Sequence, residues 1–368
     1  MSRANGSVLL VGSVVGQSAA EVMRNCAGGL GELLFGLPDG ETGLRWAWIN
    51  FLAAQTYDHC PDLETVARPN PIDPGFAGEW RSEGMDWCPQ GFQDHWQFKV
   101  RDGVSKVRFD RLGYAEDARQ SYETFRELRD EGVIPGGMRF QVSLPLIESG
   151  TRMFLARSPE SFPIMWDAYR EAMVRELAAL CEYVPPRDLS VQWDIAVEVI
   201  AMEAGDHAPE IGLPWDGPGE PLDRYVQALA ALSPHVPGDA LLGLHLCYGD
   251  IGHRHAIQPR DLGVVTAMAN AGVANAGRSV DYAHIPVPRD RHDDAYFAPL
   301  EGLQIGDTRL FIGLVHHTDG LEGTLRRLET ARKYASGFGI STECGWGRRA
   351  PETLPELMRI HTETASRL

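Results

Sequence analysis

Residues 241–250 read LLGLHLCYGD, in which residues 241–248 form a short, mostly apolar run and Asp250 follows it. A nearly continuous apolar run of this length is typical of a parallel strand that is buried on both faces. Further runs of this character lie at residues 8–15, 33–37, 139–145, 189–199, 280–287, 310–315 and 339–344. Amphipathic helical patterns lie between them, at residues 159–183, 222–232, 321–334 and 353–368. This alternation predicts an α/β fold, a single (β/α)₈ TIM barrel over residues 1–368.

The alternation is interrupted after the second expected strand, where residues 44–138 are too long for one crossover. We interpret this segment as an insertion that helps to cover the functional site. It contains five of the nine tryptophans, which would suit an aromatic substrate. Within it, HWQFKV-RDG-VSKVRFD (residues 95–110) predicts a β-hairpin that turns at Asp102 and Gly103. Residues 205–222, rich in Gly, Pro and Asp, predict a long loop.

Composition restricts the class of protein and its partners. The chain is 43% hydrophobic and 23% charged, with a net charge of −17. Such an acidic surface repels phosphate backbones and anionic lipid, so we expect no nucleic acid or membrane partner. The apolar N-terminal stretch is interrupted by Gly12 and Ser13 and is interpreted as a strand rather than a secretory signal. Six irregularly spaced cysteines suggest a reducing, cytoplasmic location, and the sequence leaves the oligomeric state open.

Most of the expected strands end in residues that can do chemistry. In a barrel the carboxyl ends of the strands meet on one face, so residues far apart in sequence become neighbours there. A charged side chain inside an apolar strand is costly unless it is paired or bound, which makes several accidents of this kind improbable. The candidates are Ser13, Asp39, Glu41, Gln192, Asp194, His245, Cys247, Tyr248, His284, His316, His317, Asp319, Glu343 and Cys344.

The most specific of these signals is His245-Leu246-Cys247. Residues two apart on a strand point the same way, so His245 and Cys247 share a face. Imidazole and thiolate together suit Zn²⁺, and Cys344 at the end of the eighth expected strand would supply a third ligand. Three protein ligands and an open position describe a catalytic zinc site. The alternative is a barrel-core histidine beside a buried structural cysteine.

These motifs resemble the catalytic barrel of cobalamin-independent methionine synthase, in the superfamily that includes uroporphyrinogen decarboxylase. The zinc-binding strand ends of that family correspond to His245-Leu246-Cys247-Tyr248 and Cys344-Gly345. The opening Val11-Gly12-Ser13 resembles the family's first strand, which cradles the amino-acid substrate. The resemblance also aligns Gln192-Trp193-Asp194 with a motif whose Asp binds the substrate amino group. It aligns LFIGLVHHTDG with the strand that carries a catalytic histidine, either His316 or His317.

Two departures from the family pattern stand out. The methionine synthase supplies a Glu as a further zinc ligand from its sixth strand, whereas here that region reads DYAHIPVPRDRHDD. His284, or no residue, replaces that ligand. The N-terminal half-barrel that helps the full-length methionine synthase to bind polyglutamyl folate has no counterpart.

The resemblance implies a zinc-dependent methyl or alkyl transferase that activates a thiol acceptor, with a methyl donor such as a folate. His316 or His317 would protonate the leaving group, as imidazole suits general acid catalysis. Asp194, with Asp39 or Glu41, would bind a substrate ammonium. Further substrate contacts are expected from Ser13, Gln192, Tyr248 and Arg289, although Arg289 also suits a surface ion pair.

Other functions remain compatible with the sequence. One is a zinc-dependent lyase or hydrolase on the same barrel, acting on a small and aromatic substrate. Another is a metal-free decarboxylase that uses Asp39 and the arginines, with both cysteines structural. A third is an inactive relative that only binds a ligand.

Overall fold

The computed structural model describes residues 6–70, 94–156, 158–205, 218–250 and 254–368. Within these residues, seven parallel strands form one curled sheet in the order β1-β4-β5-β6-β7-β8-β9. The strands are β1 Leu37–Pro38, β4 Phe140–Pro145, β5 Leu189–Ile195, β6 Leu241–Leu246, β7 Tyr282–Pro286, β8 Arg309–Val315 and β9 Gly339–Thr342. Each lies in or beside an expected apolar run, so the α/β class and the parallel sheet are confirmed.

The stretch expected as the first strand lies between the two edges of this sheet. Val8 forms isolated parallel bridges with Leu34, just before β1, and with Ile340 in β9. Backbone hydrogen bonds from Leu9 N to the Ile340 carbonyl and from Phe35 N to the Val8 carbonyl support both bridges. Further along, Ser13 bridges Gly40. The two edges of the seven-stranded sheet are therefore joined through residues 8–13.

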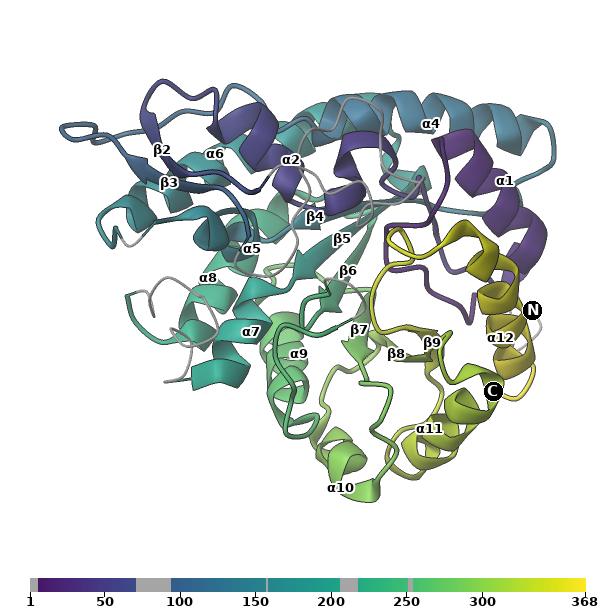
Figure 1. Ribbon diagram of the computed structural model, residues 1–368. Helices are drawn as coiled ribbons and strands as arrows, with labels where there is room; N and C mark the ends of the chain where they lie inside the picture. The colour runs from purple at the N-terminus through teal and green to yellow at the C-terminus, as the bar shows by residue number, and fades with distance from the viewer. Residues whose placement is uncertain (1–5, 71–93, 157, 206–217, 251–253) are drawn as a thin grey trace.

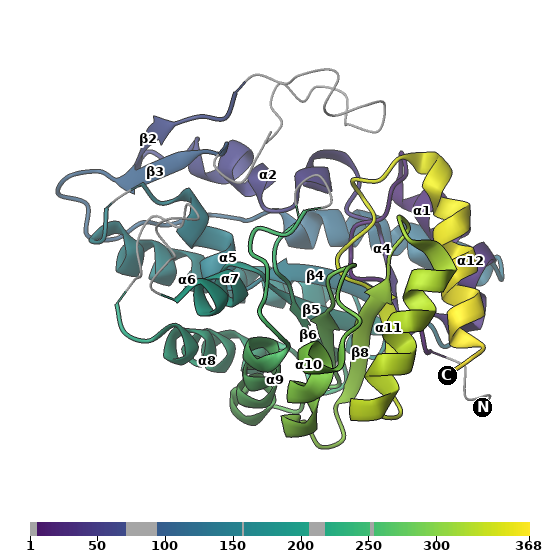
Figure 2. The same cartoon turned by 60° about the horizontal axis from the view of Figure 1, so that its bottom comes forward.

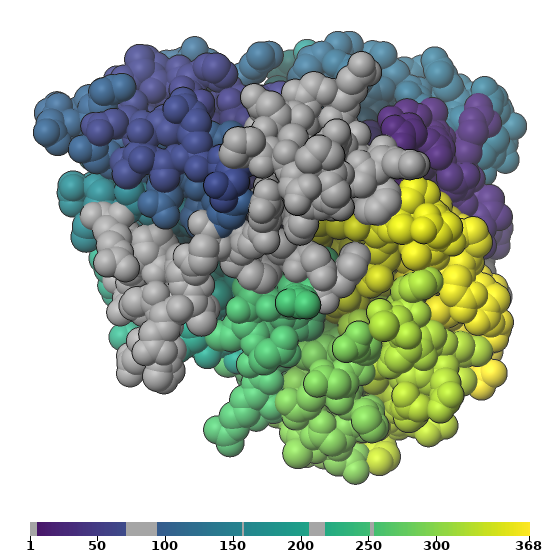
Figure 3. All heavy atoms as spheres, viewed as in Figure 1, coloured from purple at the N-terminus to yellow at the C-terminus, as the bar shows by residue number. Residues whose placement is uncertain are grey.

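Helices surround the sheet on its outer side (Figure 1). The longer ones are α1 Ala19–Leu30, α4 Tyr114–Asp130, α6 Ser161–Tyr183, α7 Val197–Ala204, α8 Pro221–Leu232, α9 Gly263–Asn275, α11 Gly320–Tyr334 and α12 Leu354–Ala365. Short helices are α2 Asn50–Leu52, α5 Ile147–Thr151 and α10 Asp294–Phe297. The four helical patterns of the sequence correspond to α6, α8, α11 and α12. Helices α1 and α12, near the two termini, pack side by side (Figures 1 and 3).

The segment after β1 carries a small second sheet. Strands β2 Leu63–Ala67 and β3 Gln97–Val100 pair antiparallel, and Figure 2 shows them with α2 on one side of the main sheet. The predicted hairpin over residues 95–110 is therefore wrong. Gly103 does adopt the turn conformation, with a φ of +82°, but residues 104–109 leave it without strand pairing.

One expected strand also ends earlier than the sequence suggested. The apolar run at residues 189–199 divides into β5, which ends at Ile195, and α7, which begins at Val197. A continuous apolar run does not distinguish a buried strand from a buried helix. The predicted loop at 205–222 lies mostly outside the described residues. No helix among the described residues is long and apolar enough to cross a membrane.

Candidate metal centre

His245, Cys247 and Cys344 come together at the carboxyl ends of two strands. His245 lies in β6, Cys247 follows that strand directly, and Cys344 follows β9. One potential ligand atom from each residue lies within 4.8 Å of the other two, and the two Sγ atoms are 3.7 Å apart. The curl of the sheet brings these strand ends together although β7 and β8 separate them in the sheet.

This donor set fits a zinc ion. Two sulfurs bound to one tetrahedral zinc at about 2.3 Å would lie about 3.8 Å apart, close to the spacing found here. The neighbouring Cys344 and burial both raise the pKa of Cys247 well above its usual value. Two thiolates so close together therefore need a cation between them. Imidazole and thiolate are the ligands that zinc prefers.

His284 lies behind His245 rather than among the ligands. Their Nδ1 atoms are 2.8 Å apart, and the Nε2 atom of His284 is 2.9 Å from the Thr342 carbonyl oxygen. Both ring nitrogens of His284 are therefore engaged within the protein. His284 is also absent from the described group of residues that could share one ion. This placement does not fit the expectation of His284 as a replacement ligand.

The three candidate ligands line one pocket with residues from other strand ends. Its empty volume is about 480 Å³, which includes solvent at the mouth. The lining residues are Val11, Ser13, Glu41, Trp48, Asp194, Ala196, His245, Cys247, Gly249, Asp250, Cys344, Gly345 and Arg348.

Two of the carboxyl groups that line this pocket, those of Glu41 and Asp194, have raised pKa values. Burial, followed by repulsion from Asp194, raises the pKa of Glu41 to about 8. Burial also raises the pKa of Asp194 to about 8, although hydrogen bonds from Gln192 and Trp48 act in the opposite direction. Carboxyl groups that hold protons near neutrality are commonly found at ligand-binding and catalytic sites.

The backbone around these carboxyl groups is strained. Glu41 and Trp48 both have positive φ angles, +52° and +51°, which non-glycine residues rarely adopt. The indole Nε1 of Trp48 donates to Asp194 Oδ2 at 3.2 Å. A Cβ at Gly12 would lie only 3.0 Å from Glu41 Oε1, so a glycine there leaves room for this carboxyl group. Strain of this kind persists where the surrounding structure enforces it, often at functional sites.

Asp39 has a different environment from the one expected for a substrate ligand. It pairs with the Arg45 guanidinium and accepts hydrogen bonds from the Ser121 hydroxyl and the Glu41 backbone. Burial raises its pKa, but Arg45 and these hydrogen bonds outweigh burial and hold the pKa below its usual value. Asp39 does not line the pocket, so it supports the Glu41 turn.

Of the residues predicted to contact the substrate, some line the pocket and others do not. Ser13 lines the pocket, and its hydroxyl accepts a hydrogen bond from Gly347 N at 3.3 Å. Gln192 is fully buried beneath the pocket and donates to Asp194 Oδ1 at 2.9 Å and to the Val11 carbonyl. Tyr248 is fully buried, with its hydroxyl 3.4 Å from that of Tyr296. Gln192 and Tyr248 therefore lie outside the lining that a substrate would contact.

The two histidines after β8 face different surroundings. His316 is buried, with Nε2 2.8 Å from the Val287 carbonyl oxygen and Nδ1 3.1 Å from Glu343 Oε2. His317 is half-buried. Neither lines the pocket with the candidate ligands. Arg289 is exposed and also lies outside that lining.

Of the polar side chains that line the pocket, those of Trp48, Asp250 and Arg348 were not among the predicted site residues. The Nη2 atom of Arg348 donates a hydrogen bond to Asp250 Oδ2 at 2.9 Å, and it lies 3.7 Å from Cys344 Sγ. The sequence offered a signal for Arg348, four residues after Cys344, but it did not separate a pocket arginine from a surface one. Trp48 belongs to the segment that was interpreted as covering the site, but no pattern in the sequence indicates which of its residues reaches Asp194.

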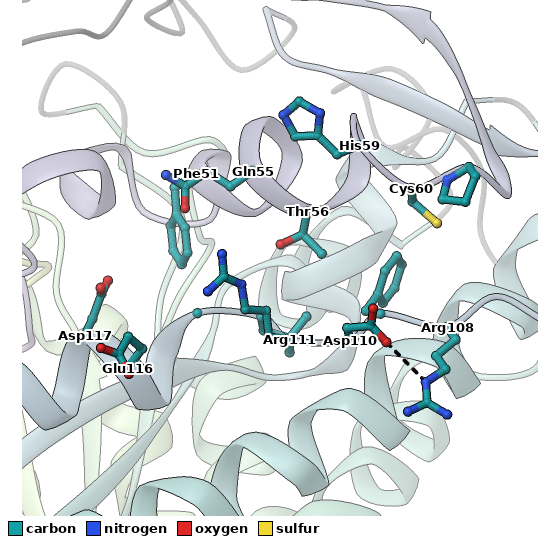
Figure 4. Close-up of a pocket in the computed structure, with 14 residues that line it drawn as sticks. Phe51, Gln55, Thr56, His59, Cys60, Arg108, Asp110, Arg111, Glu116 and Asp117 are labelled. Carbon is teal, nitrogen blue, oxygen red and sulfur yellow. Dashed lines mark ion pairs between the residues drawn. The ribbon is translucent and has the colours of Figure 1, made fainter.

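A second hollow lies outside this site, between the segment around Phe51 and the start of α4 (Figure 4). Its acidic side chains have basic partners, since Asp110 pairs with Arg108, and Glu116 with Arg119. Asp117 likewise pairs with Arg45. The hollow therefore presents balanced charges and no group of convergent ligand atoms comparable to the candidate metal centre.

Comparisons with known proteins place this geometry on a known fold. No family model matches the sequence, and a search of curated proteins gives no match. Among solved structures, a B12-independent methionine synthase from Shewanella sp. W3-18-1, in complex with selenomethionine, matches with a TM-score of 0.60 and 12% identity. The match covers 99% of this chain and 97% of that one. A methyltransferase from Methanosarcina mazei matches with a TM-score of 0.47 and 11% identity, over 96% and 94% of the two chains. The chain thus shares the fold of the B12-independent methionine synthase, as its short motifs predicted.

Proposed function

We propose that the protein is a zinc-dependent methyl or alkyl transferase whose acceptor is a small thiol. The observation that carries this proposal is the convergence of His245, Cys247 and Cys344 within 4.8 Å, in a pocket that also holds Glu41 and Asp194. The shared fold with a methionine synthase supports the proposal. A zinc ion at these residues would lower the pKa of a bound thiol, so that a nucleophilic thiolate exists at neutral pH.

The other pocket residues bind and orient the acceptor in this proposal. Asp194 takes up a substrate ammonium, which stabilises its ionised form and displaces the proton that it holds near neutrality. Trp48 and Gln192 hold Asp194 in place through their hydrogen bonds. The Ser13 hydroxyl faces the same pocket and is suited to a substrate carboxylate.

Proton transfer is assigned to Glu41 rather than to His316 or His317. Neither histidine lines the pocket, and both ring nitrogens of His316 already face acceptors. Glu41, with a pKa of about 8, still carries its proton at neutral pH and suits general acid catalysis. We assign His316, with Glu343, to support of the loop after β8.

We also propose that residues 8–13 act as the eighth strand of a closed (β/α)₈ barrel. Val8 bridges both sheet edges, which supports this closure. Residues 44–138 then form the insertion after the second strand, and Trp48 from this insertion reaches the pocket. The metal-free decarboxylase is less favoured, because Asp39 is paired with Arg45 outside the pocket lining.

Metal analysis tests the proposal first. We expect about one zinc per chain in protein purified without a metal-binding tag, and loss of zinc in both Cys247→Ser and Cys344→Ser. Cys181→Ser is the matched control, because Cys181 is half-buried in α6 and should leave the zinc content unchanged. Circular dichroism verifies that each variant is folded. Wild-type protein without zinc under reducing conditions would contradict the proposal.

Cobalt substitution then separates transfer from the alternatives. A thiol that binds the metal changes the visible spectrum of the cobalt protein, and a transferase with a thiol acceptor requires this binding. We would titrate aminothiols, and thiols of equal length that lack the amino group. Tighter binding of the aminothiols, lost in Asp194→Asn, is the expected result.

A further inference from the structure

We infer that His284 is a positioning residue that fixes the tautomer of His245 and so directs the free ring nitrogen of His245 toward Cys247 and Cys344. The inference rests on the proposed metal site but concerns a residue outside the ligand set. It starts from two distances, 2.8 Å between the Nδ1 atoms of His245 and His284, and 2.9 Å from His284 Nε2 to the Thr342 carbonyl oxygen.

The tautomers follow in sequence from these contacts. Two carbonyl groups lie near the His284 ring, those of Thr342 and Leu246, and only the Thr342 contact has hydrogen-bond geometry. A carbonyl oxygen only accepts hydrogen bonds, so we assign the ring hydrogen of His284 to Nε2, which donates it to Thr342. In a neutral ring the Nδ1 atom of His284 then has a lone pair and accepts a hydrogen bond. Its partner is Nδ1 of His245, which therefore carries the hydrogen. The lone pair of His245 is left on Nε2, the nitrogen that remains for a metal ion.

The same hydrogen bonds join the two ligand-bearing strands. His245 and His284 are register partners on the adjacent strands β6 and β7. Thr342 belongs to β9, and its hydroxyl donates to the carbonyl oxygen of Cys344. Inward side chains of alternate barrel strands share a layer, which explains how His284 on β7 reaches β9 past β8. His284 therefore connects the His245 ligand to the strand that carries Cys344.

The chemistry of the site favours this role over that of a fourth ligand. Metal-binding histidines usually donate their second ring N–H to a carboxylate, carbonyl or water, which fixes ring orientation. Here the imidazole of His284 takes the place of that acceptor. Both rings are buried, with His284 fully so and His245 3% exposed, so a wrong tautomer would leave a polar nitrogen unpaired. Ligation by His284 would break its bond to His245.

Three proteins test the inference, the wild type, His284→Asn and His284→Leu. The Asn side chain retains an acceptor near Nδ1, whereas Leu has similar bulk and no acceptor. Nitrogen-15 NMR of the metal-free wild type should show the Nδ1–H tautomer for His245 and the Nε2–H tautomer for His284. Zinc affinity, measured by competition with a chromophoric chelator, should fall about 10–100-fold in His284→Leu. His284→Asn should recover most of that loss.

The outcomes separate this inference from the proposed function. An Nε2–H tautomer for His245 in the metal-free wild type would overturn the inference, whether or not zinc binds. So would unchanged zinc affinity in a folded His284→Leu, or a zinc-dependent shift showing that His284 itself binds the ion. If His284→Leu does not fold, the wild-type tautomers and the affinity of His284→Asn decide. Absence of zinc from a wild type with the expected tautomers would contradict the proposed function instead.

Discussion

Asp39 and Asp194 are two aspartates with nearly equal burial, 5% and 7% exposed, and with opposite electrostatics. Asp39 lies beside the Arg45 guanidinium, which holds its pKa below the usual value. Asp194 has hydrogen-bond donors but forms no ion pair with a described residue, and its pKa is raised to about 8. Asp39 directly follows β1 and Asp194 lies near the end of β5, and the sequence predicted related roles for them.

The difference shows that the partner, and not burial, decides what a buried carboxylate does. A carboxylate with a buried arginine is already neutralised and contributes to the fold. A buried carboxyl group with only neutral donors keeps its proton until a cationic ligand binds. Such a group lowers the free energy of unfolding near neutral pH but provides a binding site for a cation. The predictions below test this contrast.

The largest effect is expected from Asp39→Asn. This change leaves the Arg45 guanidinium buried without its closest carboxylate, and we expect a loss of about 3 kcal/mol in the free energy of unfolding. Asp117→Asn is the matched control, because Asp117 contacts the same guanidinium while 43% exposed, and should cost under about 1 kcal/mol. Urea unfolding at pH 7 measures both. Equal losses in the two variants would remove the basis for the contrast.

The second prediction concerns pH. Between the usual pKa of Asp194 near 4 and its folded pKa of about 8, the folded state holds a proton that the unfolded state has released. The free energy of unfolding of metal-free protein therefore falls as pH rises through this window. Asp194→Asn should reduce the fall by on the order of 2 kcal/mol. Asp39 acts in the opposite direction, because its stabilisation is lost as pH falls below its usual pKa.

Urea unfolding in the presence of a chelator, at pH 5.5 and at pH 8.5, measures this difference. Glu41 has a raised pKa of the same sign, so Glu41→Gln combined with Asp194→Asn should flatten the profile further. A wild-type protein that becomes more stable between these two pH values would refute the assignment of raised pKa values to the pocket.

Much of this arrangement could be predicted from the sequence. Buried parallel strands leave continuous apolar runs, which is why β4, β6, β7, β8 and β9 were located closely. The alternation of side chains on a strand likewise placed His245 and Cys247 on one face. Cys344 could be added to them because the carboxyl ends of barrel strands converge.

The remainder depends on contacts that leave no local pattern. The division of residues 189–199 into strand and helix, and the pairing of β3 with β2, are set by tertiary packing. Arg45 is six residues from Asp39, but no periodicity indicates that it pairs with Asp39 while Asp194 has no such cation. The same holds for His284, whose role depends on a carbonyl oxygen 58 residues away.

The smallest predicted effect comes from Trp48→Phe, and it tests whether neutral donors matter to Asp194 at all. The variant removes the indole N–H that bonds the Asp194 carboxylate at 3.2 Å, so the pKa of Asp194 should rise further. Metal-free protein should then be about 1 kcal/mol less stable at pH 8.5, with little change at pH 5.5, where Asp194 is protonated. Trp46→Phe is the matched control, because the indole nitrogen of Trp46 is buried without a hydrogen-bond partner among the described residues. A loss that is the same at both pH values would indicate packing alone. A loss confined to high pH would show that Trp48 stabilises the charged form of Asp194, as Arg45 does more strongly for Asp39.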